Sequence, residues 1–163
     1  MEFVNMIFNG TFLAILGAAL AVFLPGMGSS KGTGLVGETA SGLISEEPEK
    51  FGQALLLQVL PSTQGIYGFV AAFLILFKIG LVGGSPVELT GIQGLQFLAA
   101  SLPIAIVGYV SAIRQARVSA AAVGIIAKKP NELAKGITFA AIVETYAVLA
   151  LLVSILIIFG IKL

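Results

Sequence analysis

The chain has 163 residues and a net charge of +1, with 10% charged residues and a mean hydropathy of +1.06. Soluble globular domains carry about 25% charged residues, so this composition excludes the ordinary soluble class and indicates a single membrane domain over residues 1–163. The chain has no Cys and no His, which excludes a disulfide framework, a Cys/His metal site and nucleophile–His catalysis, and its charge suggests no nucleic-acid partner.

Four apolar segments are long enough to cross a membrane, which takes about 20 residues. They lie at roughly 10–30, 54–76, 94–113 and 137–160. Stretches of small residues extend the first and third as helix. We therefore predict an all-α membrane protein of two tandem helical hairpins: residues 10–79, with helices at about 10–44 and 51–78, and residues 92–163, with helices at about 94–126 and 133–160. No Lys or Arg precedes Lys31, so the apolar run 12–24 is expected to be a retained helix rather than a signal peptide.

Positive charge is divided unevenly between the two ends of these spans. The polar connections 45–50 and 127–135 hold Lys50, Lys128, Lys129 and Lys135, whereas the turn at 80–91 has no Lys or Arg. Cytoplasmic loops are enriched in both residues, so we expect the polar connections in the cytoplasm and both termini outside the cell membrane. Lys78 and Lys162 weakly oppose this orientation, but their long side chains can snorkel to the interface.

The two halves of the sequence align without gaps when Pro48 is placed on Pro130. The same alignment places Thr63 on Thr145, and it pairs several other Leu, Gly and Ser residues. This pattern indicates a duplicated hairpin. Each half has two spans, so both halves enter the membrane in the same direction, which argues against the inverted repeats of many transporters.

Small residues crowd the first and third spans. Six glycines lie between Gly26 and Gly42, and residues 111–124 are mostly Ala, Ser and Gly. Small residues let helix backbones approach closely in lipid. Packing within one four-helix bundle would explain some of them. Their number favours an inner layer of helices repeated around a homo-oligomeric ring.

Polar residues form one layer inside the membrane. Glu144 lies about four helical turns after Pro130, Gln115 lies about four turns before it, and Thr63 and Gln64 lie about four turns after Pro48. At about 1.5 Å per residue, all four lie roughly 21 to 24 Å from the corners of the hairpins. Tyr67, three residues after Gln64, lies on the same helical face.

Glu144 is the informative member of this layer, because an ionised carboxylate at mid-membrane costs about 2.5 to 3.5 kcal/mol and marks ion or proton pathways. Neutral oxygens from Thr63, Gln64 and Gln115 suit a hard cation such as Na⁺, whereas H⁺ needs only the carboxyl group and one acceptor. A network that merely holds helices together remains an alternative. Arg114 adjoins Gln115 and could neutralise Glu144. Neighbours on a helix point about 100° apart, however, so we expect Arg114 to face elsewhere.

Two further residues, Glu38 and Pro61, have interpretations that do not require ion binding. Glu38 is nearer in sequence to its corner, Pro48, so it lies about 6 Å nearer the cytoplasm than this layer, in water or beside a base such as Lys31. Pro61 interrupts the second span and frees the carbonyl of Leu57. That carbonyl could face a cation, or Pro61 could produce a simple kink.

Three segments resemble the proteolipid subunit of V-type ATPases, particularly in the bacterial sodium-translocating enzymes. They are PEKFGQALLLQVLPSTQGIYGF (48–69), SAIRQARVSAAAVG (111–124) and AKKPNELAKGITFAAIVETYA (127–147), and the resemblance covers the chain from residue 10 onward. It implies a ring with the first and third helices inside. It also implies an ion site at Glu144, Gln115, Thr63, Gln64 and the backbone carbonyl of Leu60, with a hydrogen bond from Tyr67 to the carboxylate.

The resemblance further implies partners and a mechanism. Each copy would take Na⁺, or H⁺ as the alternative, from a channel beside a stator subunit whose Arg later displaces it, while central-stalk subunits transmit rotation and lipid surrounds the ring. This chain has no GxxxxGK[ST] motif, so nucleotide chemistry belongs to other subunits and we expect no catalytic site here. The rival interpretations are a small secondary cation-coupled transporter and a membrane bundle without coupled transport.

Overall fold

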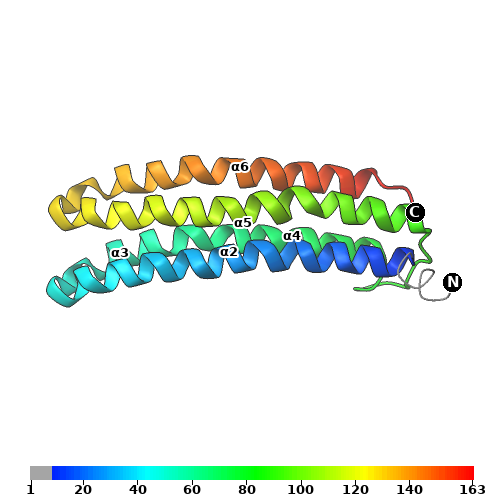
Figure 1. Ribbon diagram of the computed structural model, residues 1–163, viewed down its shortest axis with the longest axis horizontal. Coiled ribbons are helices and arrows are strands. Elements are labelled where there is room, and N and C mark those ends of the chain that lie inside the picture. The colour runs from blue at the N-terminus through cyan, green and yellow to red at the C-terminus, as the bar shows by residue number, and fades with distance from the viewer. Residues whose placement is uncertain (1–8) are drawn as a thin grey trace.

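The computed structural model describes residues 9–163, and every regular element in that range is a helix. The elements are α2 (Gly10–Glu46), α3 (Phe51–Val59), α4 (Thr63–Lys78), α5 (Gly91–Lys128) and α6 (Leu133–Gly160), with 3₁₀ turns at Pro48–Lys50, Leu60–Ser62 and Pro130–Glu132. They form one elongated bundle of four helical columns, with both hairpin corners at one end and the start of α2 and the C-terminus at the other (Figure 1). The fold predicted from the sequence is confirmed: four long apolar helices in two tandem hairpins.

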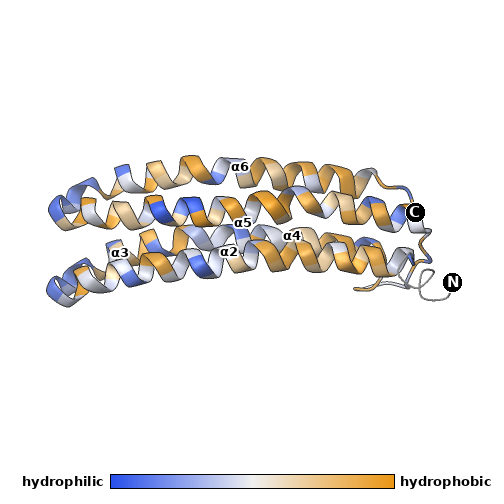
Figure 2. Cartoon of the chain, viewed as in Figure 1, coloured by the Kyte–Doolittle hydropathy of each residue, from blue (hydrophilic) through white to orange (hydrophobic). Residues whose placement is uncertain are grey.

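All four columns are long and apolar enough to cross a membrane. They run over Gly10–Glu46, Pro48–Lys78, Gly91–Lys128 and Pro130–Gly160. Hydrophilic residues gather at the end that holds the corners, and most of the remaining length is apolar (Figure 2). Large side chains such as Phe69, Phe73 and Phe77 are exposed along α4. A lipid surrounding accepts such side chains without the cost that water imposes.

The two corners share one backbone geometry. Glu47 has φ −132° and ψ 74°, and its repeat counterpart Lys129 has φ −143° and ψ 79°. A proline follows each and begins a 3₁₀ turn. Buried Lys50 joins the corners, because its Nζ donates to the Ala127 carbonyl at 2.8 Å and pairs with Glu47 at 2.6 Å. The similar backbone angles at the two corners are expected if one hairpin was duplicated.

Glycines let the helices approach closely where α2 packs against α5 and α4. A Cβ added to Gly28 would lie 2.7 Å from the Tyr109 carbonyl oxygen, and one added to Gly68 would overlap the carbonyl of Ala21. Contacts this short leave no room for a side chain. The small residues of the first span therefore serve packing between the two hairpins as well as any packing between copies.

Lys78 has partners inside the bundle. Its Nζ donates to the carbonyl oxygens of Ile158 and Ile161, at 2.6 and 2.7 Å. A cation at this position satisfies the free carbonyls and the negative dipole at the C-terminus of α6. The side chain therefore caps a helix rather than simply snorkelling, which gives Lys78 a structural role unrelated to orientation.

Candidate ion-binding site

Pro61 divides the second column near its middle. It lacks the N–H that a continuous helix needs, and the backbone tightens into the 3₁₀ turn Leu60–Ser62 between α3 and α4. Just beyond it, the N–H of Gly65 donates to Ser29 Oγ on α2 at 2.9 Å. This hydrogen bond from α4 to α2 fixes the position of the first turn of α4 after the break at Pro61.

Glu144, on α6, has partners on two other helices. Tyr67 Oη on α4 donates to one carboxylate oxygen at 2.5 Å, and Gln115 Nε2 on α5 donates to the other at 3.1 Å. Gln115 Nε2 also donates to the Ala140 carbonyl at 3.2 Å, one turn before Glu144. The carboxylate therefore lies where three helices, α4, α5 and α6, meet.

The other predicted residues extend this network through α4. Gln64 Nε2 donates to Gln115 Oε1 at 2.6 Å, and Thr63 Oγ1 lies 3.4 Å from Gln64 Oε1. Thr63 Oγ1 donates to the Leu60 carbonyl at 3.1 Å. A chain of hydrogen bonds thus runs from Gln64 through Gln115 and Glu144 to Tyr67. Thr63 has one hydroxyl proton, which it can donate to Gln64 Oε1 or to the Leu60 carbonyl but not to both, so Thr63 and Leu60 border this chain.

The amide pair at the centre of this chain is sealed from solvent and lipid. Gln64 and Gln115 are both 0% exposed, whereas Glu144, Thr63 and Tyr67 are partly buried. Buried polar groups are costly unless every donor and acceptor has a partner. These amides are therefore held in place, with the carboxylate at the edge of the network.

Sequence reasoning missed one member of the site. Ser111, one turn before Gln115, accepts a hydrogen bond from Gln64 Nε2 at 3.3 Å and donates to the Val143 carbonyl at 3.2 Å. It ties the amide of Gln64 to the residue before Glu144. A signal existed, because Ser111 is four residues from Gln115 and so lies on the same helical face.

The remaining predictions concern residues expected outside the network. Arg114 is exposed and forms no salt bridge with Glu144 within residues 9–163, so the expectation that it faces elsewhere is confirmed. Glu38 is exposed beside α3, away from the network. No side-chain hydrogen bond of the six residues reaches the Leu57 carbonyl in the described range, whereas the Leu60 carbonyl accepts one from Thr63 Oγ1.

The donor set limits the chemistry available here. No group of three or more Asp, Glu, His or Cys side chains able to hold a metal occurs in residues 9–163. One carboxylate with neutral amide, hydroxyl and carbonyl oxygens balances a single positive charge. Hard monovalent ions and protons fit this arrangement better than a divalent or thiophilic metal does.

Comparison with known proteins matches the chain to one family and to two relatives whose names agree with that family. The model of the family described as the C subunit of ATP synthase matches the chain twice, over residues 16–75 and 98–157, with the same spacing that aligns the two halves of the sequence. The chain is 51% identical over 150 residues to the V-type sodium ATPase subunit K of Enterococcus hirae, covering 92% of each chain. It is 38% identical over 149 residues to the A-type ATP synthase subunit K of Methanocaldococcus jannaschii, covering 91% of this chain and 63% of the relative.

Proposed function

Because this chain belongs to the family of the ATP synthase C subunit, we propose that it is the rotor-ring proteolipid subunit of a V-type ATPase and carries Na⁺ across the membrane at Glu144. The observation that carries the proposal is the carboxylate of Glu144, which lies within the apolar span α6 and is bonded to Tyr67 and Gln115 at the end of a buried polar chain. A sodium-translocating relative supports the choice of ion.

Five residues are proposed as ligands of the ion: Glu144, Gln115, Thr63, Gln64 and, through its backbone carbonyl, Leu60. Each offers an oxygen, and Na⁺ is a hard cation that prefers oxygen ligands. Rotation of the Gln115 amide by half a turn exchanges its nitrogen for its oxygen beside the carboxylate. Tyr67 is proposed to hold the carboxylate in place through its 2.5 Å hydrogen bond.

Ion binding neutralises Glu144, and the neutral site can then face lipid as the ring turns. Moving one elementary charge across 100 mV exchanges about 2.3 kcal/mol, so the ring can couple ion flow to work. We propose that an Arg of a stator subunit displaces the ion on its return and that central-stalk subunits join the ring to the nucleotide-binding part. The corners Pro48–Lys50 and Pro130–Glu132 are proposed to face the cytoplasm, with the termini outside.

Each copy contributes one carboxylate to the ring under this proposal. The repeat counterpart of Glu144 is Ser62, so the first hairpin has no acidic group at this depth. The counterpart of Thr63 is Thr145, which donates to the Ile142 carbonyl of its own helix and is exposed. The duplication therefore supplies a matched pair of threonines, one inside the proposed site and one outside it.

This pair gives the first test. Dicyclohexylcarbodiimide labels a carboxyl group when it is protonated, so bound Na⁺ should slow the labelling of Glu144. We expect Thr63→Val and Gln115→Leu to weaken sodium protection at least tenfold, because each removes one ligand oxygen, and to change the labelling rate without sodium far less. Thr145→Val should leave protection unchanged.

Labelling is measured against pH at several sodium concentrations, with potassium as the ionic-strength control. Protection equal in sodium and potassium at every pH would make the site a proton site, and the choice of Na⁺ would be wrong. Equal effects of Thr63→Val and Thr145→Val would remove Thr63 from the ligand set.

A further inference from the structure

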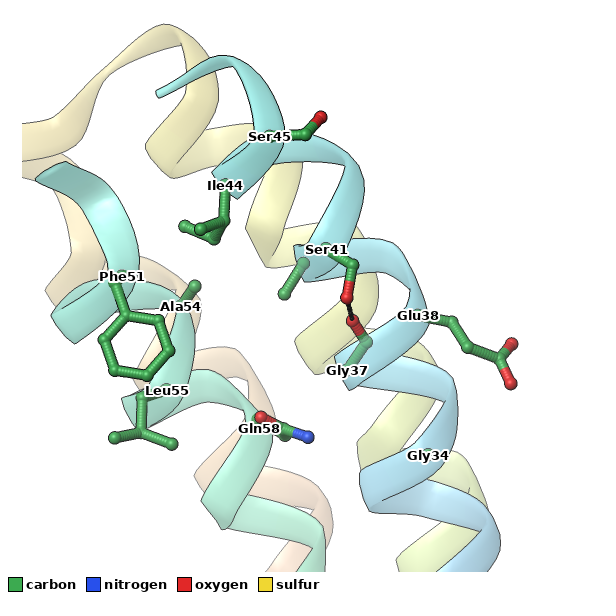
Figure 3. Close-up of a pocket in the computed structure, with 11 residues that line it drawn as sticks. Gly34, Gly37, Glu38, Ser41, Ile44, Ser45, Phe51, Ala54, Leu55 and Gln58 are labelled. Atoms are coloured by element: carbon green, nitrogen blue, oxygen red, sulfur yellow. Dashed lines mark hydrogen bonds between the residues drawn. The ribbon is translucent and has the colours of Figure 1, made fainter. Parts of the chain in front are cut away.

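A groove of about 550 Å³ opens between α2 and α3 in the half of the bundle near the corners (Figure 3). Residues of both helices line it, among them Gly34, Gly37, Ser41 and Ile44 of α2 and Phe51 of α3. All of its lining residues belong to α2 and α3, and none belongs to the second hairpin. Glu38 borders it and points away from α3 (Figure 3).

The internal repeat shows what packs into a surface of this kind. The alignment of the two halves pairs Gly34, Ser41 and Ile44 with Ala116, Val123 and Ile126 on the second hairpin. Those three counterparts are almost fully buried, in one apolar cluster with Val36 and Leu57 of the first hairpin. On the second hairpin, therefore, this surface is covered by a preceding hairpin.

The opposite surface shows the same asymmetry. Leu57 is 0% exposed against the second hairpin, whereas its repeat counterpart Phe139 is 57% exposed. Phe139 and Val118, the counterpart of buried Val36, border a depression on the outer face of α5 and α6 together with Arg117. The first hairpin thus has an open groove. The second hairpin has outward side chains, Phe139 and Val118, whose counterparts Leu57 and Val36 pack between the two hairpins of one chain.

We propose that the groove beside Glu38 receives the second hairpin of a neighbouring copy, that Phe139 of that copy packs against it, and that Glu38 forms an ion pair with Arg117 of that copy. The contact between copies then repeats the contact between the two hairpins of one chain. Such an interface is head-to-tail, and its repetition closes a ring. This inference rests on the proposed rotor function and names the residues that join its subunits.

Charge supports the choice of a second copy as the occupant. Glu38 and Arg117 are both exposed, and neither forms a salt bridge within the part of the chain that the structure describes. Ionisable groups within membrane spans are normally paired. Counted along the helices from the corner prolines Pro48 and Pro130, the depths of Glu38 and Arg117 differ by about 4.5 Å. An Arg side chain can bridge that distance.

The same arrangement of neighbouring copies predicts where the Arg114 side chain lies. Its repeat counterpart Gly32 lies against the second hairpin, where an added Cβ would be 3.1 Å from the Ala116 Cβ. The counterpart of Ala116 is Gly34, in the open groove. Arg114 therefore lies opposite the Gly34 of the neighbouring copy, where the missing side chain leaves room for it, and not against the carboxylate of Glu144.

Disulfide formation tests the packing, because the protein contains no Cys of its own. A Cβ added to Gly28 would lie 3.2 Å from the Ala112 Cβ, and the repeat counterparts of these residues are Val110 and Ser30. Mild oxidation of the ring carrying Ser30→Cys and Val110→Cys should give a ladder of covalent oligomers on a denaturing gel. The control pair Ser30→Cys with Phe159→Cys should give no ladder, because Phe159 lies about 16 Å further from the corners than Ser30 when residues are counted along the helices from Pro48 and Pro130.

A double-mutant cycle tests the ion pair. Glu38→Gln and Arg117→Gln should each lower the temperature at which the detergent-solubilised ring dissociates. The double variant should lower this temperature no more than the more damaging single variant does. Exchange of the charges within one chain, Glu38→Arg with Arg117→Glu, should restore part of the lost stability.

The outcomes separate this inference from the function on which it rests. If the Cys-free parent forms no ring by native mass spectrometry, the rotor proposal fails and the interface fails with it. If the parent forms a ring but the Ser30 and Val110 pair gives no ladder, or a ladder no stronger than the control pair, the packing is wrong. Strictly additive losses for Glu38→Gln and Arg117→Gln would overturn the ion pair.

Discussion

Glu144→Gln is expected to abolish ion transport while ring assembly stays intact. Gln is nearly isosteric with Glu and can still accept the hydrogen bond from Tyr67, which lies 2.5 Å from the carboxylate. It carries no charge, so it cannot balance a cation and has no proton to exchange. The helices keep their contacts, because Glu144 lies at the edge of the network and the buried amides Gln64 and Gln115 remain bonded to each other.

Transport is measured as sodium uptake driven by ATP in vesicles that contain the complete ATPase, and assembly as the mass of the purified ring. Glu38→Gln serves as the control, because it removes a carboxylate that does not touch the network. The control should lower transport much less than Glu144→Gln does. Equal loss from the two changes would show that the wrong carboxylate had been assigned to the ion.

Gly68→Ala is expected to destabilise the bundle strongly, although it adds only one methyl group. The added Cβ would overlap the Ala21 carbonyl and lie 2.9 Å from the Pro25 side chain, so α4 has to move away from α2. Overpacking of this kind costs about 1–3 kcal/mol, and rigid backbone at the contact places the effect at the upper end. Because Gly68 follows Tyr67 directly, the shift should also disturb the hydrogen bond to Glu144.

Gly42→Ala is the matched control, because nothing lies within 4 Å of the Cβ it adds to α2. Ala has the higher helix propensity, so this control should be neutral or slightly stabilising. Thermal unfolding of the solubilised ring compares the two variants, and sodium protection of Glu144 reports the state of the site. Similar melting temperatures for both would show that the helices tolerate a wider separation than the structure has.

Much of this architecture could be predicted from the sequence, because the membrane limits what an apolar segment can do. Runs of about 20 apolar residues have to be helices, and the shared corner prolines Pro48 and Pro130 give the register of the duplication. Depth then follows from counting residues. Counting alone placed Glu144, Gln115 and Thr63 at one level, and in the structure Gln115 bonds to Glu144 while Thr63 lies beside Gln64, the other partner of Gln115.

The parts that could not be predicted depend on rotation and on partners. The role of Ser111 requires α5 and α6 to be packed, because its hydroxyl bonds to the Val143 carbonyl on another helix. Lys78 looked like an interfacial side chain until the end of α6 was found beside it. The partner of Arg117 lies outside a single copy under the present proposal, so no amount of counting within one chain could identify it.

The most direct test of the central claim is equilibrium binding of radioactive sodium to the purified ring. We expect saturable binding of a single ion per copy, which weakens as the pH falls because protons compete for Glu144, and which an excess of potassium does not displace. Rings with Glu144→Gln should bind none, while rings with Thr145→Val should bind as the parent does. Sodium binding that survives Glu144→Gln would contradict the assignment of Glu144 as the ion-binding carboxylate. A parent ring that binds no sodium at every alkaline pH tested would contradict the choice of Na⁺.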